Sequence, residues 1–161
     1  MIERHRAVAI VAGAIGAAVA VAVMEIASTS AEFPLMAIPF ATSIVLVMGS
    51  PDAEPAQPRA LIGGHLVSTL IALATFHVFG NGPWIAALAV GLAMIGMHAT
   101  RTFHPPAGID PLVVAVNGMS WTFLLAPVGV GAVLLAAFAF AWHNLAHLGA
   151  KDAPAWPRRW W

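Results

Sequence analysis

Cysteine and tyrosine are missing from the 161-residue sequence, and charged residues make up only 9% of it. The lack of cysteine excludes disulfide bonds, thiolate nucleophiles and sulfur-ligated metal sites. A soluble domain carries about 25% charged residues, whereas here 60% of the residues are hydrophobic and the mean hydropathy is +0.86. The seven cations balance the seven acidic residues, so no basic surface for nucleic acid is expected.

The few charges are confined to short stretches of the chain. None lies in 7–24, 33–51, 60–100 or 111–150. Because about 20 helical residues cross a bilayer, the stretch 60–100 alone can cross twice. The sequence therefore predicts an all-α integral membrane protein with no room for a soluble catalytic domain.

The apolar runs predict six membrane segments within a single transmembrane domain, 1–161. They lie at 7–27, 35–48, 60–79, 84–100, 104–117 and 121–146. Four of them are full spanning helices, and two, 35–48 and 104–117, are short segments broken by proline. The order long, short, long occurs twice, which predicts two helix–half-helix–helix repeats.

Two topologies are compatible with these segments. If the short pieces are re-entrant there are four crossings, and Arg59 and Arg101 face away from the other cations. If they cross as broken helices there are six crossings, and all the lysines and arginines fall on one side, as the positive-inside rule prefers. With that side cytoplasmic, both termini are expected in the cytoplasm, with the chain in a bacterial inner membrane.

The two proline breaks are the candidate functional sites. Non-helical backbone cannot face lipid, so it lies within protein or lines a cavity. The first N–H groups of a helix are unpaired and carry partial positive charge, and paired broken helices indicate a transporter site. Two such helix starts at one cavity favour a small anion, unless the prolines only kink buried helices. The predicted binding residues of the two starts are Pro39, Phe40, Ala41, Thr42, Ser43, Pro105, Pro106, Ala107 and Gly108.

Polar residues beside the second break extend this predicted site. Arg101 offers a planar guanidinium that suits an oxyanion, although it could instead mark the membrane edge. His98 lies three residues before it on the same helix face. His104 could bind the anion directly or serve as a cap or core histidine, and His65 could face the same cavity from the first half.

Asp110 is an ionisable residue inside a membrane segment, which makes it a functional candidate. Its negative charge would oppose a nearby anion. Three explanations are open: it pairs with Arg101, it is protonated, or it faces the aqueous edge. If it is protonated, it could couple proton movement to transport.

Other kinds of site have weaker support. His143 and His147 are four residues apart and could share a metal, but no acidic or cysteine ligand lies near them, so no metal and no cofactor is predicted. No Ser-His-Asp order, Gly-rich phosphate loop or pair of catalytic carboxylates can be read from the sequence. The chain is therefore not predicted to be an enzyme.

Several of these motifs resemble the signature of the HPP family of integral membrane proteins. The resemblance covers roughly 34–125, in the family's order. Its blocks are Pro39-Phe40-Ala41-Thr42-Ser43, Ser50-Pro51-Asp52-Ala53, Ala56-Gln57-Pro58-Arg59, Ile62-Gly63-Gly64-His65 and His98-Ala99-Thr100-Arg101-Thr102 followed by His104-Pro105-Pro106-Ala107-Gly108. The resemblance implies a four-helix membrane protein. Some family members are associated with nitrite transport, and some carry CBS domains, for which this chain has no room.

The sequence departs from the family pattern at both breaks. Ile109-Asp110-Pro111 follows the second block where small residues are common, and Ala41 stands where glycine is common. The residues and the resemblance together predict a transporter or channel for a small monovalent inorganic anion, with nitrite favoured. The alternative is a non-transporting sensor or scaffold subunit that pairs with a soluble partner. So small a chain leaves little protein around a pore, which predicts a homo-oligomer in the lipid bilayer.

Overall fold

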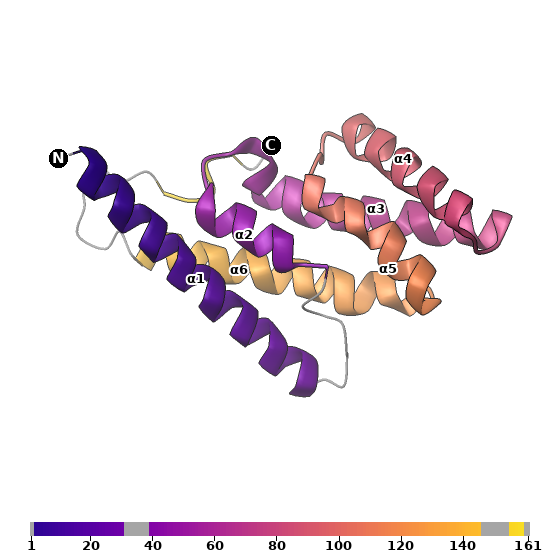
Figure 1. Ribbon diagram of the computed structural model, residues 1–161, viewed down its shortest axis with the longest axis horizontal. Helices are drawn as coiled ribbons and strands as arrows, with labels where there is room; N and C mark the ends of the chain where they lie inside the picture. The colour runs from indigo at the N-terminus through magenta and orange to yellow at the C-terminus, as the bar shows by residue number, and fades with distance from the viewer. Residues whose placement is uncertain (1, 31–38, 146–154, 160–161) are drawn as a thin grey trace.

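The computed structural model describes residues 2–30, 39–145 and 155–159, and within these ranges the fold is helical without β-strand (Figure 1). This confirms the all-helical prediction. The elements are α1 (Ile2–Ser30), α2 (Ala41–Gly49), η1 (Glu54–Ala56), α3 (Pro58–Phe79), α4 (Pro83–Ala99), η2 (Pro105–Ile109), α5 (Asp110–Asn117), η3 (Leu124–Gly129) and α6 (Val130–Leu145).

Among the described residues, three helical stretches are long and apolar enough to cross a membrane: α1, α3, and η3 continued by α6. Helix α4 is apolar but has only 17 residues. Helices α2 and α5 have nine and eight residues. At 1.5 Å per residue each reaches roughly half of the ~30 Å hydrocarbon core, so neither can cross it alone.

The first long helix, α1, packs through one narrow face. Its buried positions recur every three or four residues, and they are Gly13, Gly16, Ala20, Met24 and Ser28. A Cβ on Gly13 would lie 2.8 Å from the Met48 carbonyl oxygen, and one on Gly16 would lie 2.7 Å from the Trp142 ring. Glycine thus lets α2 and α6 come close to α1, which is how membrane helices pack.

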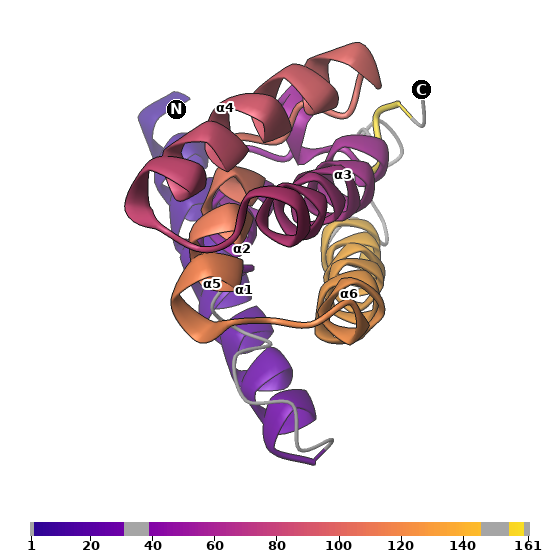
Figure 2. The same ribbon diagram turned by 90° about the vertical axis from the view of Figure 1, so that its right-hand side faces the viewer.

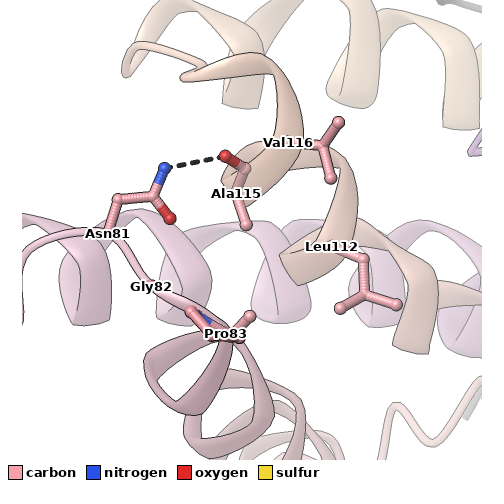
Figure 3. Close-up of a pocket in the computed structure, with 7 residues that line it drawn as sticks. Asn81, Gly82, Pro83, Leu112, Ala115 and Val116 are labelled. Carbon is pink, nitrogen blue, oxygen red and sulfur yellow. Dashed lines mark hydrogen bonds between the residues drawn. The ribbon is translucent and has the colours of Figure 1, made fainter.

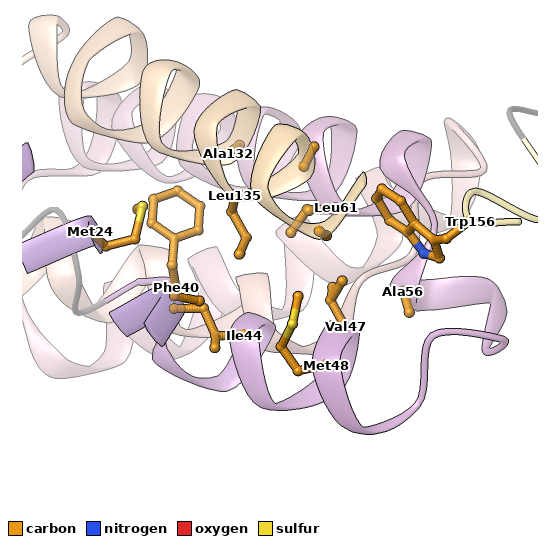
Figure 4. Packing of buried hydrophobic residues seen from close by; sticks show 13 residues of the cluster. Met24, Phe40, Ile44, Val47, Met48, Ala56, Leu61, Ala132, Leu135 and Trp156 are labelled. Atoms are coloured by element: carbon orange, nitrogen blue, oxygen red, sulfur yellow. The ribbon is translucent and has the colours of Figure 1, made fainter. Parts of the chain in front are cut away.

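Helix α3 contacts α4, α5 and α6, and it lies between α4 and α6 (Figures 1 and 2). At one point along it, Leu61 joins an apolar cluster with Phe40, Ile44 and Leu135, part of which is shown in Figure 4. Further along, Leu73 joins a second apolar cluster. Between these two points the buried face of α3 is polar.

The two short helices run in opposite directions from the middle of the molecule. Helix α2 runs toward the end where α3 begins, whereas α5 runs toward the end where α3 finishes (Figure 1). The beginning of α2 contacts η2, and η2 packs on α3. Ser43 of α2 also bonds to His65 of α3. The two proline breaks therefore meet, although they are about sixty residues apart in sequence.

The described arginines gather at one end of the bundle. Arg59, in the first turn of α3, donates from Nη2 to the Thr100 carbonyl oxygen at the end of α4, over 2.9 Å. Arg158, in the C-terminal tail, donates from Nε to the Asp52 carboxylate just before α3. Figure 1 shows that α1 also starts toward this end.

The last span is less regular than a single helix over 121–146. Helix α6 begins only at Val130, and Ala126 before it has extended backbone angles (φ −140°, ψ 124°). The cause is Pro127, which has no N–H to donate and whose ring collides with the preceding turn.

Candidate functional site: a buried polar cluster

Six polar side chains with no solvent exposure meet between the two apolar clusters. Helix α2 supplies one, α3 supplies three, and the segment from the end of α4 into α5 supplies two. They are Ser43, His65, Ser68, Thr69, His104 and Asp110, each 0% exposed. Unpaired polar groups in such a place would be very unfavourable, so the hydrogen bonds among them are the central feature of the site.

Local structure explains how these side chains come together. On α3, His65, Ser68 and Thr69 are spaced by three and four residues and therefore share one face. Gly64 lies beside them, and a Cβ there would be 2.5 Å from the His104 Cβ. The glycine thus lets the chain at His104 lie directly on α3.

The hydrogen bonds form a row that starts at Pro55. His104 Nδ1 lies 2.6 Å from the Pro55 carbonyl oxygen, and His104 Nε2 lies 2.8 Å from Ser43 Oγ. The same Ser43 Oγ is 2.8 Å from His65 Nε2. His65 Nδ1 then lies 2.9 Å from Asp110 Oδ2.

Further contacts hold this row in place. The Thr69 hydroxyl donates to Asp110 Oδ2 over 3.1 Å. The Ser68 hydroxyl donates to the Ala107 carbonyl oxygen over 2.7 Å and so fixes η2 on α3. The Phe40 ring covers His65, with ring centroids 4.5 Å apart. Both imidazole rings are thereby oriented as well as buried.

Comparison with known proteins identifies the family. The model of the family described as HPP, transmembrane region, matches residues 2–151. The chain belongs to the HPP family. This confirms the resemblance carried by the His104–Gly108 motif, and it agrees with an integral membrane protein.

Two curated proteins of Dictyostelium discoideum, both named only as transmembrane proteins, are similar to this HPP-family chain. One is 33% identical over 130 residues, which cover 76% of the chain and 40% of the relative. The other is 32% identical over 130 residues, which cover 76% of the chain and 44% of the relative. The chain therefore spans less than half of either relative. No solved structure matches it.

Not every predicted site residue of the HPP chain joins the cluster. The predicted Ser43, His65 and His104 form its row of hydrogen bonds. His98 is exposed and stacks on Phe103, with ring centroids 4.2 Å apart. Arg101 is exposed at the end of α4. The guanidinium and the cluster are therefore separate features.

The remaining predicted residues lie around the same break. Pro39 and Phe40 are buried at the start of α2, whereas Ala41 and Thr42 are exposed. In η2, Ala107 is buried, Pro106 and Gly108 are half-buried, and Pro105 is exposed. Each helix start thus has one side in the protein and one side outside it.

Asp110 has a partner that the sequence did not indicate. It is fully buried and bonds to His65 and Thr69, so it neither pairs with Arg101 nor faces an aqueous edge. Ser68 and Thr69 also escaped prediction, although their spacing from His65 could have indicated them. The Pro55 carbonyl had no signal in the sequence.

A Ser-His-Asp row, which could not be read from the sequence, is present in the fold. Ser43, His65 and Asp110 have the hydrogen-bond order of an acyl-transfer triad. A nucleophile must reach its substrate, yet Ser43 is 0% exposed and its hydroxyl is also held by His104. In this conformation the row can hold protons but cannot attack a substrate.

Two hollows lie beyond Asp110, near the turn between α3 and α4. One, of about 240 Å³, is lined by Leu73 and Val114, which are one helical turn beyond Thr69 and Asp110. The other, of about 580 Å³, opens between the start of α4 and the end of α5. Figure 3 shows Asn81 at its edge, donating to the Ala115 carbonyl oxygen over 2.8 Å.

The predicted histidine pair near the C-terminus gives no metal site in the described part of the chain. His143 Nε2 bonds to the Val47 carbonyl oxygen over 3.0 Å, and His147 lies outside the described residues. Within residues 2–30, 39–145 and 155–159, no three histidine or acidic side chains form a metal-binding group.

Proposed function

We propose that this HPP-family chain carries a small monovalent inorganic anion across the bilayer, with nitrite favoured. The observation that supports this is the meeting of both proline breaks at one buried polar cluster. Polar and ionisable groups inside a membrane protein mark ion and substrate pathways. The stability of the fold does not by itself explain six buried polar residues in an apolar bundle, because replacing such groups with apolar side chains of similar volume is often neutral or stabilising.

The start of α2 supports an anion as the transported ion. Ala41, Thr42 and Ser43 form its first turn, and the N–H groups of a first turn have no partner within the helix. They bear partial positive charge. Asp110 does not oppose this when a proton is shared with His65, to which its carboxyl group bonds, because the pair is then neutral.

The described conformation is closed, because all six cluster residues are 0% exposed. Transport therefore requires a segment to move away from α3. The segment around Thr102 and His104 is the candidate for this movement, because it contacts α3 at Gly63 and Gly64, which have no side chains to hold it. Exposed Arg101, next to this segment, would attract anions from the aqueous side.

The positions of the cations support the six-crossing topology, with α2 and α5 as the helical halves of broken crossings. The contacts of Arg59 and Arg158 put the loop before α3, the end of α4 and the tail at one end. By the positive-inside rule this end is cytoplasmic. Pairing of α2 with α5 as corresponding half-helices belongs to the same proposal, as does a homo-oligomeric assembly.

The test is nitrite uptake into liposomes that contain only the purified chain. The variant His104→Asn keeps a donor for the Pro55 carbonyl but loses the contact with Ser43. We expect its initial uptake rate to fall by about tenfold or more, equivalent to ~1.4 kcal/mol of barrier. The matched control, His98→Asn, changes an exposed histidine six residues earlier and should transport like the original chain.

The outcomes separate the two functions under consideration. Uptake that depends on His104 and is competed by other small anions supports transport and ranks the anions. If the folded original chain moves none of nitrite, nitrate or chloride, transport is wrong and the sensor or scaffold function is favoured.

A further inference from the structure

The Ser43 hydroxyl stands between two histidine nitrogens. Its Oγ lies 2.8 Å from Nε2 of His65 and 2.8 Å from Nε2 of His104. A hydroxyl has one proton and can donate to only one of them. The other nitrogen must carry a proton and donate it to Oγ, because otherwise a buried nitrogen would face the oxygen without a hydrogen bond.

The outer nitrogens of the two rings have fixed partners. His104 Nδ1 lies 2.6 Å from the Pro55 carbonyl oxygen, which can only accept, so this nitrogen always carries a proton. His65 Nδ1 faces the Asp110 carboxyl group at 2.9 Å. A proton must lie between these two atoms, on the ring or on the carboxyl group.

These requirements fix the proton content of the row. In a first form His65 is an imidazolium and Asp110 a carboxylate. In a second, the proton between them sits on Asp110. In a third, His104 is the imidazolium. Each form is electrically neutral, whereas loss of one proton leaves a net negative charge and a broken hydrogen bond among fully buried side chains.

We propose that Ser43, His65, His104 and Asp110 form a binding site for a single exchangeable proton, which passes between the two histidines through the Ser43 hydroxyl. In the transfer, His65 Nε2 gives its proton to Ser43 Oγ as the original Ser43 proton moves to His104 Nε2. The imidazolium charge moves from His65 to His104. Asp110 stays a carboxylate, and no proton is gained or lost.

The charged and titratable groups on neighbouring elements have other surroundings. Glu54 of η1 is exposed, Arg59 of α3 bonds to Thr100, and His98 of α4 stacks on Phe103. His77 of α3 faces the Trp121 ring and His143 of α6 bonds to Val47. Glu25 and Arg6 of α1, Arg101 and Arg159 are exposed, and Arg158 pairs with Asp52. None of them has a hydrogen bond or ion pair to the row within the described residues.

The row also has a direction along α3. Its His104 end bonds to half-buried Pro55, in the loop at the arginine-rich end. Its Asp110 end points toward the hollow of about 240 Å³, from which Leu73 and Val114 separate it.

The proton site is inferred from the row alone, whereas its coupling to anion movement rests on the proposed function. If nitrite and the proton move together, the neutral protonated row would not repel the anion, whereas the row without the proton carries a negative charge that would. The experiment therefore has one measurement that needs no transport and one that does.

The first measurement is ¹⁵N solid-state NMR of the full chain in lipid bilayers with labelled histidine. His65→Asn and His104→Asn assign the two rings. At neutral pH we expect His104 Nδ1 to be protonated, and the protonated fractions of the two Nε2 atoms to add up to one. Both Nε2 atoms protonated, or both unprotonated, in the original chain would overturn the proposal.

Substitution of the bridging serine tests the relay. In the original chain we expect the protonated fractions of the two Nε2 atoms to change together as the pH is varied. In Ser43→Ala the two fractions should change independently of each other. Ser43→Thr restores a hydroxyl and should restore the joint behaviour. Thr75→Ala, which removes a buried hydroxyl of α3 that bonds to the Ile71 carbonyl oxygen of the same helix, should leave the joint behaviour unchanged. Joint titration that persists in Ser43→Ala would show that the hydroxyl is not the path.

The second measurement is the pH inside liposomes during nitrite uptake. Acidification that follows nitrite uptake and disappears in Ser43→Ala supports this coupling, whereas alkalinisation would contradict movement of the two together. If the chain takes up nitrite but the NMR shows that His65 and His104 are protonated independently, the proton site is wrong and the proposed transport function is still supported. The NMR signature without any anion uptake supports the proton site and contradicts the proposed function.

Discussion

Arg101 is the residue at which sequence and backbone disagree most clearly. It has φ 56°, in the left-handed region. Its N–H donates to the His98 carbonyl oxygen and the Thr102 N–H to that of Met97, which is the usual closure of a helix at a glycine. An L side chain in this conformation costs about 1–2 kcal/mol.

Arg101→Gly should therefore stabilise the protein. Part of the relieved strain is offset, by about 0.4–1 kcal/mol, because glycine is more flexible in the unfolded chain. We expect a small rise in the thermal unfolding midpoint in detergent, and a fall for Arg101→Val, whose branched side chain fits this backbone poorly. A lower midpoint for the glycine variant would contradict this account of the α4 terminus.

At the residue scale, sequence reasoning found the groups but not their partners. His65, His104 and Asp110 stand out because ionisable residues are rare in membrane segments. Pairing of His65 with Asp110 joins positions 45 residues apart, which no local pattern specifies. Arg101 is a predicted anion-binding residue because a guanidinium suits an anion, yet its position in the C-terminal closure of α4 leaves it exposed.

At the scale of elements, the contact between α3 and the 102–104 segment depends on a missing side chain. A Cβ on Gly64 would meet the His104 Cβ at 2.5 Å and the Thr102 carbonyl oxygen at 2.9 Å. Gly64→Ala should therefore push this segment from α3. Overpacking of this kind costs about 1–3 kcal/mol, and the bond between His104 and Ser43 should weaken with it.

The measurement is the thermal unfolding midpoint together with the ¹⁵N signals of His104. Gly91→Ala is the matched control, because a Cβ at this exposed position in α4 meets nothing within 4 Å. Alanine favours a helix over glycine by up to about 1 kcal/mol, so the control should be as stable as the original chain or more stable. Equal effects of the two substitutions would show that Gly64 is not a contact site.

The helices themselves were largely predictable, because long runs without charge can only be buried in lipid or protein. The expected segment 60–79 corresponds to α3 at Pro58–Phe79, and 84–100 to α4 at Pro83–Ala99. The last span was predicted without its interruption. Pro127 was visible in the sequence, but an apolar run gives no sign of whether neighbouring helices satisfy the backbone groups that a proline leaves free.

At the scale of the whole molecule, the loops that lie at the same end of the bundle are expected on the same side of the membrane. The loop before α3 and the described tail lie together, held by Arg158 on Asp52 and by Gln57, whose side-chain oxygen accepts from the Arg158 N–H over 2.7 Å. The link between α5 and η3 lies at the opposite end (Figure 1). A four-crossing topology with re-entrant short segments would separate Arg59 from Arg158 across the membrane, whereas six crossings keep them on one side.

The absence of cysteine makes this distinction direct to measure, since each introduced thiol is the only one in the chain. Ser50, Ala155 and Ser120 are all exposed. In sealed vesicles of known orientation, an impermeant thiol reagent should label Ser50→Cys and Ala155→Cys from the same face, and Ser120→Cys from the other. Labelling of Ser50→Cys and Ala155→Cys from opposite faces would contradict six crossings. It would also contradict the placement of the loop before α3 and the C-terminal tail together at the His104 end of the proton row.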